Sequence, residues 1–396
     1  MNSADTDVAI LGAGLAGLSI AAWLATTTSS QAPAPQVHIL DARREDTQDR
    51  TWCFWDQQPH PFRQAISHRW PRWQVRHAGQ TVEREDGRHG YAMITATDFR
   101  RSAYAALAER EEFTMIRGVA VDAVTSSDSA LDVATSSGRL RARAVIDTRP
   151  PPSTALVAHG GVWQVFHGLE IAAPDHGYPP STARLMDFQP ASSGIHFIYV
   201  LPLGAHRLLV EWTCFHADRA HEDCQALLNQ HATPPALGEW LDKRLRPGWS
   251  VTRHETGCLP MMPVLPPRRG PRYLSAGIRG GWMRPATGYM FASCQQGAAD
   301  VARQLRQAHA SGRWNLVAPR IRPSSLQWMD KVFLHAIRRH PEQAPDWFMR
   351  LFQGSSAAQQ RRFLGDQPRL SDLFAIMRAL PPGPFLRAAF TPTHSA

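Results

Sequence analysis

Hydrophobic residues form short continuous runs near the N-terminus, and this pattern predicts a strand, a helix and a second strand. Residues 8–11 are an apolar strand that ends in a cluster of glycines, and a helical stretch follows. Residues 37–41 form the next apolar run and end in an aspartate. A strand, a helix and a strand within about 35 residues are typical of a βαβ unit in a parallel sheet.

The middle of the chain changes to alternating apolar and polar positions. Residues 119–147 alternate in this way, which predicts a β-meander that returns to the parallel sheet, and three prolines at 150–152 then break the pattern. From residue 162 to about 260 several short apolar strands are separated by polar turns. We interpret this stretch as a second, β-rich domain inserted into the first.

The last third of the chain returns to the first domain and then becomes helical. Residues 273–277 are expected to form the last parallel strand, and residues 293–308 the helix that closes this domain. After Pro319, apolar side chains recur at spacings of three and four, which predicts helices. The predicted fold is therefore α/β with a doubly wound parallel sheet, an inserted β-rich domain and a helical C-terminal region. The expected boundaries are 1–150 with 261–310, 151–260, and 311–396.

Composition narrows the class of protein. The chain has 396 residues, 43% hydrophobic, so it can bury a large core in two or three domains. Its net charge of +9 comes almost entirely from arginine, and the basic residues are not interleaved with aromatic ones as in a nucleic-acid motif, so we expect no nucleic-acid partner. The five cysteines form no CxxC pair, which favours a reducing compartment without disulfides or a metal. No signal peptide or membrane span is evident, so we expect a cytoplasmic protein.

The glycines after the first strand give the first chemical prediction. Gly12, Gly14 and Gly17 stand where a dinucleotide fold needs a tight turn, a close backbone approach to pyrophosphate, and close packing of helix on sheet. The adjacent Leu15 and Ala16 open the helix, whose free N–H groups attract phosphate. The alternative is a turn that only packs the βαβ unit.

Asp41 ends the second strand, where a carboxylate can accept hydrogen bonds from ribose hydroxyls. The glycine-rich opening resembles that of FAD-binding oxidoreductases more than that of nicotinamide dehydrogenases. This resemblance implies a doubly wound Rossmann-like flavoprotein fold, in which the inserted β-rich domain would bind the substrate.

Several further segments carry chemical information. They are Thr51-Trp52-Cys53-Phe54-Trp55, Leu185-Met186-Asp187-Phe188, Leu209-Val210-Glu211-Trp212-Thr213, Glu255-Thr256-Gly257-Cys258-Leu259-Pro260-Met261, and residues 277–289 (GIRGGWMRPATGY). Together, and in this order, they resemble the bacterial lycopene β-cyclases from Asp7 to about Gln304.

This resemblance implies an enzyme that binds FAD but catalyses an isomerisation without net electron transfer. In the family the flavin is reduced, usually by NADPH, before it supports the reaction. Protonation of a linear end of lycopene gives a cation, the next double bond attacks it, and proton loss closes a β-ionone ring. Both ends react, through a monocyclic carotenoid, to give β-carotene.

The resemblance places Glu211 at the position of the essential acid, and its surroundings agree with that role. A glutamic acid with an ordinary pKa of about 4.3 is protonated in only about one molecule in 500 at pH 7. Raising the pKa to about 7 by desolvation corresponds to roughly 3.7 kcal/mol. Glu211 directly follows three apolar residues, so we expect it to face an apolar pocket. With the resemblance, this predicts that Glu211 protonates the polyene or controls the proton, and the alternative is an exposed glutamate at a strand end. Asp187 is the second catalytic candidate, holding Glu211 or the flavin, with a purely structural role as its alternative.

The glycine-rich turn after the last strand is expected to lie against the flavin. The residues that match the family there are Gly277, Arg279, Gly280, Gly281, Thr287 and Gly288. Many flavin enzymes have a Gly-Asp pair at this place, whereas this chain has Gly277-Ile278, which speaks against a conventional monooxygenase or dehydrogenase. Ala286 stands where a Thr or Ser is more usual.

Aromatic side chains and a base would complete the site. Trp52, Phe54, Trp55, Trp282 and Tyr289 are candidates for stabilising the cation through cation–π attraction, with ordinary core packing as the alternative for each. Candidate bases are His167, His176 and His196, again with a core or surface role as the alternative.

Lycopene is dissolved in membranes, so a cyclase needs access to a bilayer. Trp347, Phe348, Leu351 and Phe352 stand near the basic residues Arg338, Arg339 and Arg350 and resemble an interfacial amphipathic helix, although a helix packed on the core fits the pattern too. Residues 301–350 also hold nine Lys and Arg against three Asp and Glu. We expect a peripheral membrane protein. The alternative functions are an FAD-dependent monooxygenase or other carotenoid-modifying flavoenzyme, and a non-catalytic carotenoid carrier.

Overall fold

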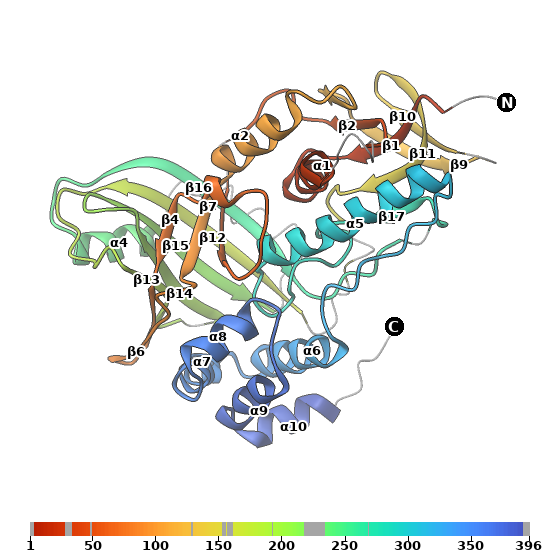
Figure 1. Cartoon of the computed structure of the whole chain (residues 1–396). Coiled ribbons are helices and arrows are strands. Elements are labelled where there is room, and N and C mark those ends of the chain that lie inside the picture. The colour runs from red at the N-terminus through yellow and green to blue at the C-terminus, as the bar shows by residue number, and fades with distance from the viewer. Residues whose placement is uncertain are drawn as a thin grey trace.

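The described residues form two large β-sheets and a small third sheet, with a group of helices beneath them (Figure 1). The computed structural model describes residues 4–27, 34–47, 50–127, 130–152, 156, 161–191, 193–217, 234–267 and 269–390. Cys224 lies outside these residues, and no disulfide bond joins the other four cysteines.

The first sheet has seven strands in the order β8-β2-β1-β11-β10-β9, with β17 also paired to β11. β1, β2, β8, β11 and β17 run parallel, and β9 and β10 form an antiparallel meander on β11. The predicted βαβ unit, meander and last parallel strand are therefore confirmed. The bounds are Thr6–Leu11 (β1), Val37–Asp41 (β2), Phe113–Arg117 (β8), Val121–Ser126 (β9), Leu131–Thr135 (β10), Gly138–Asp147 (β11) and Tyr273–Ser275 (β17).

Residues 8–11 of the central strand β1 are all apolar because both faces of the strand are covered. Val8 and Ile10 pack in the cluster that includes the helices α1 (Leu15–Thr27), α2 (Ala96–Leu107) and α5 (Phe291–Ser311). Ala9 and Leu11 pack in the cluster that includes residues of β9 and β10. A continuous apolar run is the expected pattern for a strand buried on both faces. The helix predicted at residues 293–308 is thus confirmed as α5.

The second sheet also has seven strands, in the order β16-β12-β15-β14-β13-β5-β6. Neighbours are antiparallel except β13 and β5. β5 and β6 come from residues 72–85, ahead of the expected boundary at residue 150, and extend this sheet. The bounds are Arg72–His77 (β5), Gln80–Glu85 (β6), Val162–Ala172 (β12), Thr182–Gln189 (β13), Ile195–Pro202 (β14), Arg207–His216 (β15) and Ser250–Met261 (β16).

A small three-stranded sheet connects the two large ones. It has the order β3-β7-β4 and comprises Thr51–Trp55 (β3), His68–Trp70 (β4) and Tyr91–Thr95 (β7).

The two faces of the second sheet are covered differently. Helix α4 (Pro235–Arg244) packs with Leu169, Ile198 and Val210 on one face, which we call the outer face. The C-terminal helices share a cluster with Leu185, Phe197 and Leu209 on the inner face. These helices are α6 (Ser324–Arg339), α7 (Ala344–Gln353), α8 (Ala357–Leu364), α9 (Leu370–Ala379) and α10 (Pro382–Phe390), so the predicted helical C-terminal region is confirmed.

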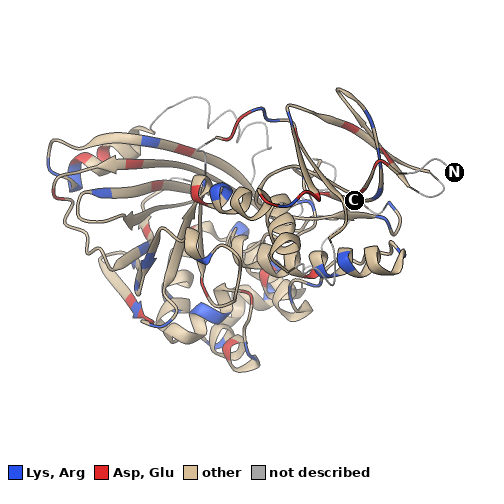
Figure 2. Cartoon of the chain, turned by 45° about the horizontal axis from the view of Figure 1, so that its top comes forward, with Lys and Arg blue, Asp and Glu red and all other residues tan. Residues whose placement is uncertain are grey.

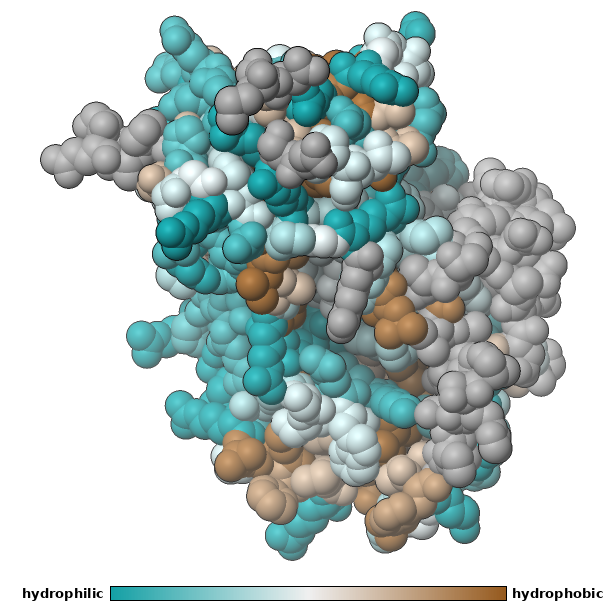
Figure 3. All heavy atoms as spheres, turned by 90° about the vertical axis from the view of Figure 1, so that its right-hand side faces the viewer, coloured by the Kyte–Doolittle hydropathy of each residue, from teal (hydrophilic) through white to brown (hydrophobic). Residues whose placement is uncertain are grey.

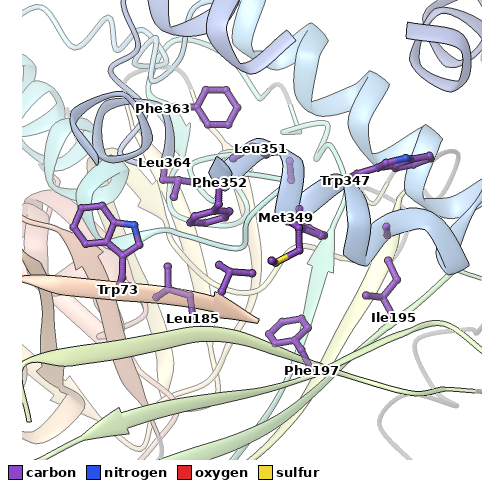
Figure 4. Close-up of a cluster of buried hydrophobic side chains, with 14 of the residues drawn as sticks. Trp73, Leu185, Ile195, Phe197, Trp347, Met349, Leu351, Phe352, Phe363 and Leu364 are labelled. Atoms are coloured by element: carbon purple, nitrogen blue, oxygen red, sulfur yellow. The ribbon is translucent and has the colours of Figure 1, made fainter. Parts of the chain in front are cut away.

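Helix α7 belongs to the core. Trp347, Phe348, Leu351 and Phe352 are at most 8% exposed and belong to the hydrophobic cluster that the helices share with the inner face of the second sheet (Figure 4). Within this cluster the ring of Trp347 packs on Phe385 of α10. The interpretation of these four residues as an interfacial element is therefore wrong. Their apolar face meets protein, which is the alternative that the same spacing allowed.

Charged residues of both signs are spread over the elements in the view of Figure 2. Among the described residues, no helix combines the length and apolar character that crossing a membrane requires. Nor do the described ranges contain a group of His, Cys, Asp or Glu that could hold a metal ion.

Candidate active site

A cavity of about 510 Å³ lies between the inner face of the second sheet, the segment after β17, and the C-terminal helices. Its lining is mainly apolar and aromatic. Lining residues from the sheets include Trp52, Tyr91, Phe166, Leu185, Met186, Phe197, Tyr199 and Phe215, and those from the helices include Phe333, Phe348, Leu351, Phe352, Phe363 and Phe385.

Glu211 lines this cavity from β15 and stands in a row of three residues across three strands. Gly168 of β12 is paired with Glu211 on one side and with Glu255 of β16 on the other. A Cβ atom on residue 168 would lie 2.7 Å from Cγ of Glu255 and 3.1 Å from Cγ of Glu211. The missing side chain of Gly168 therefore leaves the space in which the two glutamates meet.

A guanidinium group and a hydroxyl group contact the carboxylate of Glu255. Arg253 Nη1 lies 2.6 Å from Glu255 Oε2, and Thr51 Oγ1 donates a hydrogen bond of 2.8 Å to the same oxygen. Arg253 also donates to Thr51 Oγ1 and to Glu170 Oε2, at 3.0 Å and 3.1 Å. Because a buried carboxylate paired with a guanidinium is stabilised in its charged form, we assign the negative charge of the pair to Glu255.

The proton of the pair is correspondingly assigned to Glu211. Burial raises the pKa of Glu211 well above its ordinary value. The charge of Glu255 and a hydrogen bond between the two side chains raise the pKa further, and Arg253 opposes them. The arrangement keeps a carboxylic acid protonated at the wall of an apolar cavity, as a general acid requires.

A chain of hydroxyl groups lies beside the acid. Tyr199 Oη donates to Tyr91 Oη at 3.1 Å, and Tyr91 Oη donates to Tyr289 Oη at 3.0 Å. The thiol of Cys53 also bonds to Tyr199 and Tyr91. Burial raises the pKa of Tyr91, Tyr199, Tyr289 and Cys53, so these groups stay neutral at physiological pH.

Asp187 lies on the opposite face of the sheet from Glu211. It is paired with Ile198 of β14, whereas Glu211 is paired with Tyr199, and successive residues of a strand point to opposite faces. Its carboxylate lies 3.3 Å from Arg184 Nη1 and 3.7 Å from Arg76 Nη1. These contacts agree with the structural role that was the alternative for Asp187.

Two of the five candidate aromatic residues line the cavity. These are Trp52 and Tyr289. Phe54, Trp55 and Trp282 are at most 2% exposed and pack in the core.

The candidate histidines lie elsewhere. His167 and His196 are paired with Trp212 and Cys214, on the outer face, and His176 Nε2 lies 2.8 Å from the carbonyl oxygen of Gly204. The structure brings none of the three to the described cavity lining.

The turn between β1 and α1 has the shape of an anion site. Gly12 has a φ of +104°, and a Cβ on residue 17 would lie 2.0 Å from the carbonyl oxygen of Gly12. A Cβ on residue 14 would meet nothing within 4 Å, so open space adjoins the backbone where Leu15 and Ala16 start α1. No acidic residue occupies the first turn of this helix. These features fit a pyrophosphate group.

Asp41 lies at the end of β2 beside this turn. Its Oδ2 accepts a hydrogen bond of 2.8 Å from the Ala13 N–H, and Arg43 Nη2 donates to the same oxygen at 2.8 Å. Burial raises the pKa of Asp41, but the hydrogen bonds from Arg43 and Ala13 outweigh burial and hold the pKa below its usual value. An ionised carboxylate in this position fits a ribose hydroxyl.

The turn after β17 joins the anion site to the cavity. A Cβ on Gly277 would lie 2.9 Å from Cβ of Ala16, so this turn packs on the start of α1. Its neighbours Ile278, Thr287 and Gly288 line the cavity. The guanidinium of Arg279 instead contacts Asp147 and the carbonyl oxygens of Arg149 and Pro150. Gly280 and Gly281 continue the turn, their N–H groups bonded to the carbonyl oxygens of Ala276, Gly277 and Ile278.

A buried ion-pair network ties this segment to the C-terminal helices. Arg284 lies 2.8 Å from Asp330 of α6, and Arg322 lies 2.8 Å from Asp366. Arg322 also donates to the carbonyl oxygens of Gly281 and Trp282.

The roles of Gly168, Glu255, Arg253 and the tyrosine chain were not predicted from the sequence. Glu255 stood in a segment that resembles the family, and strands were expected between residues 162 and 260. The register that brings the two glutamates together carries no local signal in the sequence.

The chain is similar in sequence to proteins of one family. The family model described as "Lycopene cyclase protein" matches residues 7–390. Two similar proteins are called lycopene beta-cyclase: one from Pseudescherichia vulneris is 26% identical over 96% of this chain and 95% of its own length, and one from Pantoea ananas is 26% identical over 98% of both.

Solved structures share the fold at low sequence identity. Klebsiella pneumoniae HpxO complexed with FAD has a TM-score of 0.60 at 14% identity, covering 96% of this chain and all of that one. A geranylgeranyl bacteriochlorophyll reductase-like protein from Thermoplasma acidophilum has a TM-score of 0.59 at 14% identity, with 96% and 98% covered. For p-nitrophenol 4-monooxygenase from Pseudomonas putida the TM-score is 0.57 at 17% identity, with 97% of both chains covered. The α/β flavoenzyme fold is thereby confirmed.

Proposed function

The chain belongs to the lycopene cyclase family, and from this premise we propose that it is a lycopene β-cyclase. This isomerase, an intramolecular lyase, would convert the linear ends of lycopene to β-ionone rings, through γ-carotene to β-carotene. The names of the two relatives support this activity. The observation that carries the proposal is the Glu211–Glu255 pair at the wall of an apolar cavity.

Glu211 is the proposed proton donor. Its carboxyl group passes a proton to the terminal double bond of the polyene, and the C–H bond that forms leaves a carbocation on the neighbouring carbon. The next double bond of the chain supplies the electron pair that closes the six-membered ring. Loss of a proton from the ring then gives the neutral product, so the overall reaction is an isomerisation.

Glu255 is the proposed positioning residue for this donor. Its charge, held by Arg253 and Thr51, disfavours ionisation of Glu211 and keeps the acid protonated near neutral pH. A group whose pKa lies near the working pH is the most effective general acid.

The cavity wall protects the cation. Its lining is largely apolar, and the hydroxyl groups of the tyrosine chain are neutral and bonded to one another. Trp52 and Tyr289 present aromatic rings there, and a cation over such a ring gains about 0.5 to 2 kcal/mol.

FAD is the proposed cofactor, with NADPH as its reductant. Residues Gly12–Gly17 would hold its pyrophosphate, Asp41 its ribose, and the turn from Gly277 to Gly281 with Thr287 and Gly288 would adjoin the flavin. The reduced flavin, when bound, supplies negative charge beside the carbocation. Arg279 would support the turn through Asp147 rather than touch the cofactor.

The proposed partners are lycopene, monocyclic carotenoid intermediates and the membrane surface. We propose a peripheral protein on the cytoplasmic side, because a hydrocarbon substrate resides in the bilayer.

An anaerobic assay tests the proposal. Purified protein with FAD, either oxidised or chemically reduced, is mixed with lycopene in lipid vesicles, and the carotenoids are separated by chromatography. We expect β-carotene only with reduced flavin and no stoichiometric oxidation of the flavin. Unchanged lycopene despite bound FAD would overturn the proposal, and consumption of oxygen and NADPH in step with product would indicate a monooxygenase.

Two substitutions on the same sheet locate the chemistry. Glu211→Gln should bind lycopene without turnover, whereas Asp187→Asn, on the opposite face, serves as the matched control and should retain turnover. Full activity of Glu211→Gln would exclude Glu211 as the donor and leave a carrier or another acid to be considered.

A further inference from the structure

An apolar surface lies on the last two described helices. Leu370, Phe374 and Met377 of α9 recur at helical spacing, as do Leu386 and Phe390 of α10. These five side chains, which we call the α9–α10 surface, are between 44% and 82% exposed. Apolar residues are visible at the lower end of the molecule in Figure 3, where Figure 1 places both helices. Soluble monomers rarely expose such clusters without a binding role.

The surface is continuous with the candidate active site. Met377 and Leu386 belong both to the α9–α10 surface and to the cavity lining. Trp328 of α6 is likewise half exposed and lines the cavity. Since the same side chains face solvent and cavity, the cavity opens within this surface.

Positive charge accompanies the apolar residues. Residues 367–390 include Arg369, Arg378 and Arg387, all exposed, and a single acidic residue, Asp372. Asp372 is buried and bonded to Arg362. The two helices therefore present apolar and basic side chains without an exposed carboxylate. This combination is typical of elements that lie in the interface of a bilayer with anionic lipids.

We propose that the α9–α10 surface docks on an anionic lipid bilayer and that the cavity opens there directly into the hydrocarbon region. The inference rests on the proposed function, because a linear hydrocarbon can enter from the lipid without crossing water. A second copy of the chain on this surface would instead close the cavity mouth against the membrane.

Vesicle flotation tests the docking surface independently of catalysis. The full-length protein is floated with vesicles of phosphatidylcholine and phosphatidylglycerol. Phe374→Ser with Phe390→Ser should lower partition by about tenfold per side chain, the change that corresponds to roughly 1.4 kcal/mol each. The matched control is Leu265→Ser with Val317→Ser, which removes side chains that are 66% and 69% exposed elsewhere and should float like the wild type.

Turnover separates failure of this inference from failure of the proposed function. Phe374 and Phe390 lie outside the described cavity lining, so the double variant should convert lycopene in detergent micelles but lose most conversion in vesicles. If neither the wild type nor the double variant converts lycopene in micelles or in vesicles, the proposed function fails. Flotation still measures whether the α9–α10 surface binds the bilayer. Equal flotation of the double variant and the wild type would overturn the inference.

Quenching of tryptophan fluorescence gives a second measurement, in protein that keeps all five residues of the α9–α10 surface. Brominated lipid should quench part of the tryptophan emission, and Trp328→Phe should remove that part. A wild-type dimer that dissociates in the Phe374→Ser, Phe390→Ser variant would identify the surface as an interface between copies, and would also overturn the inference.

Discussion

Gly168→Ala tests the geometry of the acid pair without removing either acid. The added Cβ would lie 2.7 Å from Cγ of Glu255 and 3.1 Å from Cγ of Glu211. Carbon atoms prefer a separation of about 3.5 to 4.0 Å, so both side chains must move away from residue 168. We expect the protein to fold with a stability loss of about 1 to 3 kcal/mol, the usual range for overpacking.

The size of the catalytic effect follows from the charge separation. If the distance between the carboxyl groups grows from about 4 to about 6 Å, the repulsion between two unit charges falls from about 4.2 to about 2.8 kcal/mol at an effective dielectric of 20. The difference of about 1.4 kcal/mol equals about one pKa unit. Burial still raises the pKa of Glu211, but the contribution of Glu255 is reduced.

The pH–rate profile measures this change. Glu211 must be protonated to act, so activity is lost as pH rises through its pKa. In Gly168→Ala this loss should occur about one pH unit lower than in the wild type. At pH values above both midpoints, the variant should be about tenfold slower than the wild type. Gly238→Ala is the matched control, since a Cβ there meets nothing within 4 Å. A folded Gly168→Ala protein with the wild-type midpoint and rate would refute the reasoning.

Three further substitutions have distinct expected outcomes. The folded protein holds a proton on Glu211 that the unfolded chain releases above a pKa of about 4.3, so wild-type stability falls by about 1.4 kcal/mol per pH unit until the folded pKa is reached. Glu211→Gln should therefore melt at a higher temperature than the wild type at pH 8, and the difference should vanish near pH 4; parallel melting curves would contradict this. Asp187→Asn should lower the melting temperature slightly through its lost pairs with Arg184 and Arg76, and a change in its pH–rate midpoint would show coupling to Glu211. Gly14→Val should fold normally but purify without flavin absorbance, because its side chain would fill the open space beside α1, and full flavin content would argue against a pyrophosphate there.

Much of the fold follows from local sequence patterns. Residues 8–11 are apolar on both faces of β1, and Gly12 and Gly17 are required by a positive φ and by a close contact, so both features are visible in a short window. The apolar surroundings of Glu211 were likewise predicted from the three apolar residues that precede it, whereas its role as the acid came from the family resemblance and stays a prediction.

The remaining features depend on long-range contacts. Helices α7 and α9 both carry an apolar stripe, but only the tertiary structure shows that Phe348 is covered by the second sheet while Phe374 is exposed. Periodicity predicts that a helix has an apolar face and does not say whether protein or lipid covers it. The face of the sheet on which Asp187 lies could not be predicted for a similar reason, because a bulge in β13 alters the register of this strand against β14.

The row formed by Glu211, Gly168 and Glu255 suggests a way of searching for acid pairs in unrelated proteins. Its members are 43 and 44 positions apart along the chain, so no linear motif contains them. In the plane of the sheet they are immediate neighbours, with the glycine in the middle strand. Because a one-residue slip of a strand moves every side chain to the other face, a one-residue shift of β15 or β16 against β12 would separate the pair without changing any of the three residues. Such a site is therefore better recognised by the pairing of an acid, a glycine and an acid across adjacent strands than by a linear sequence motif.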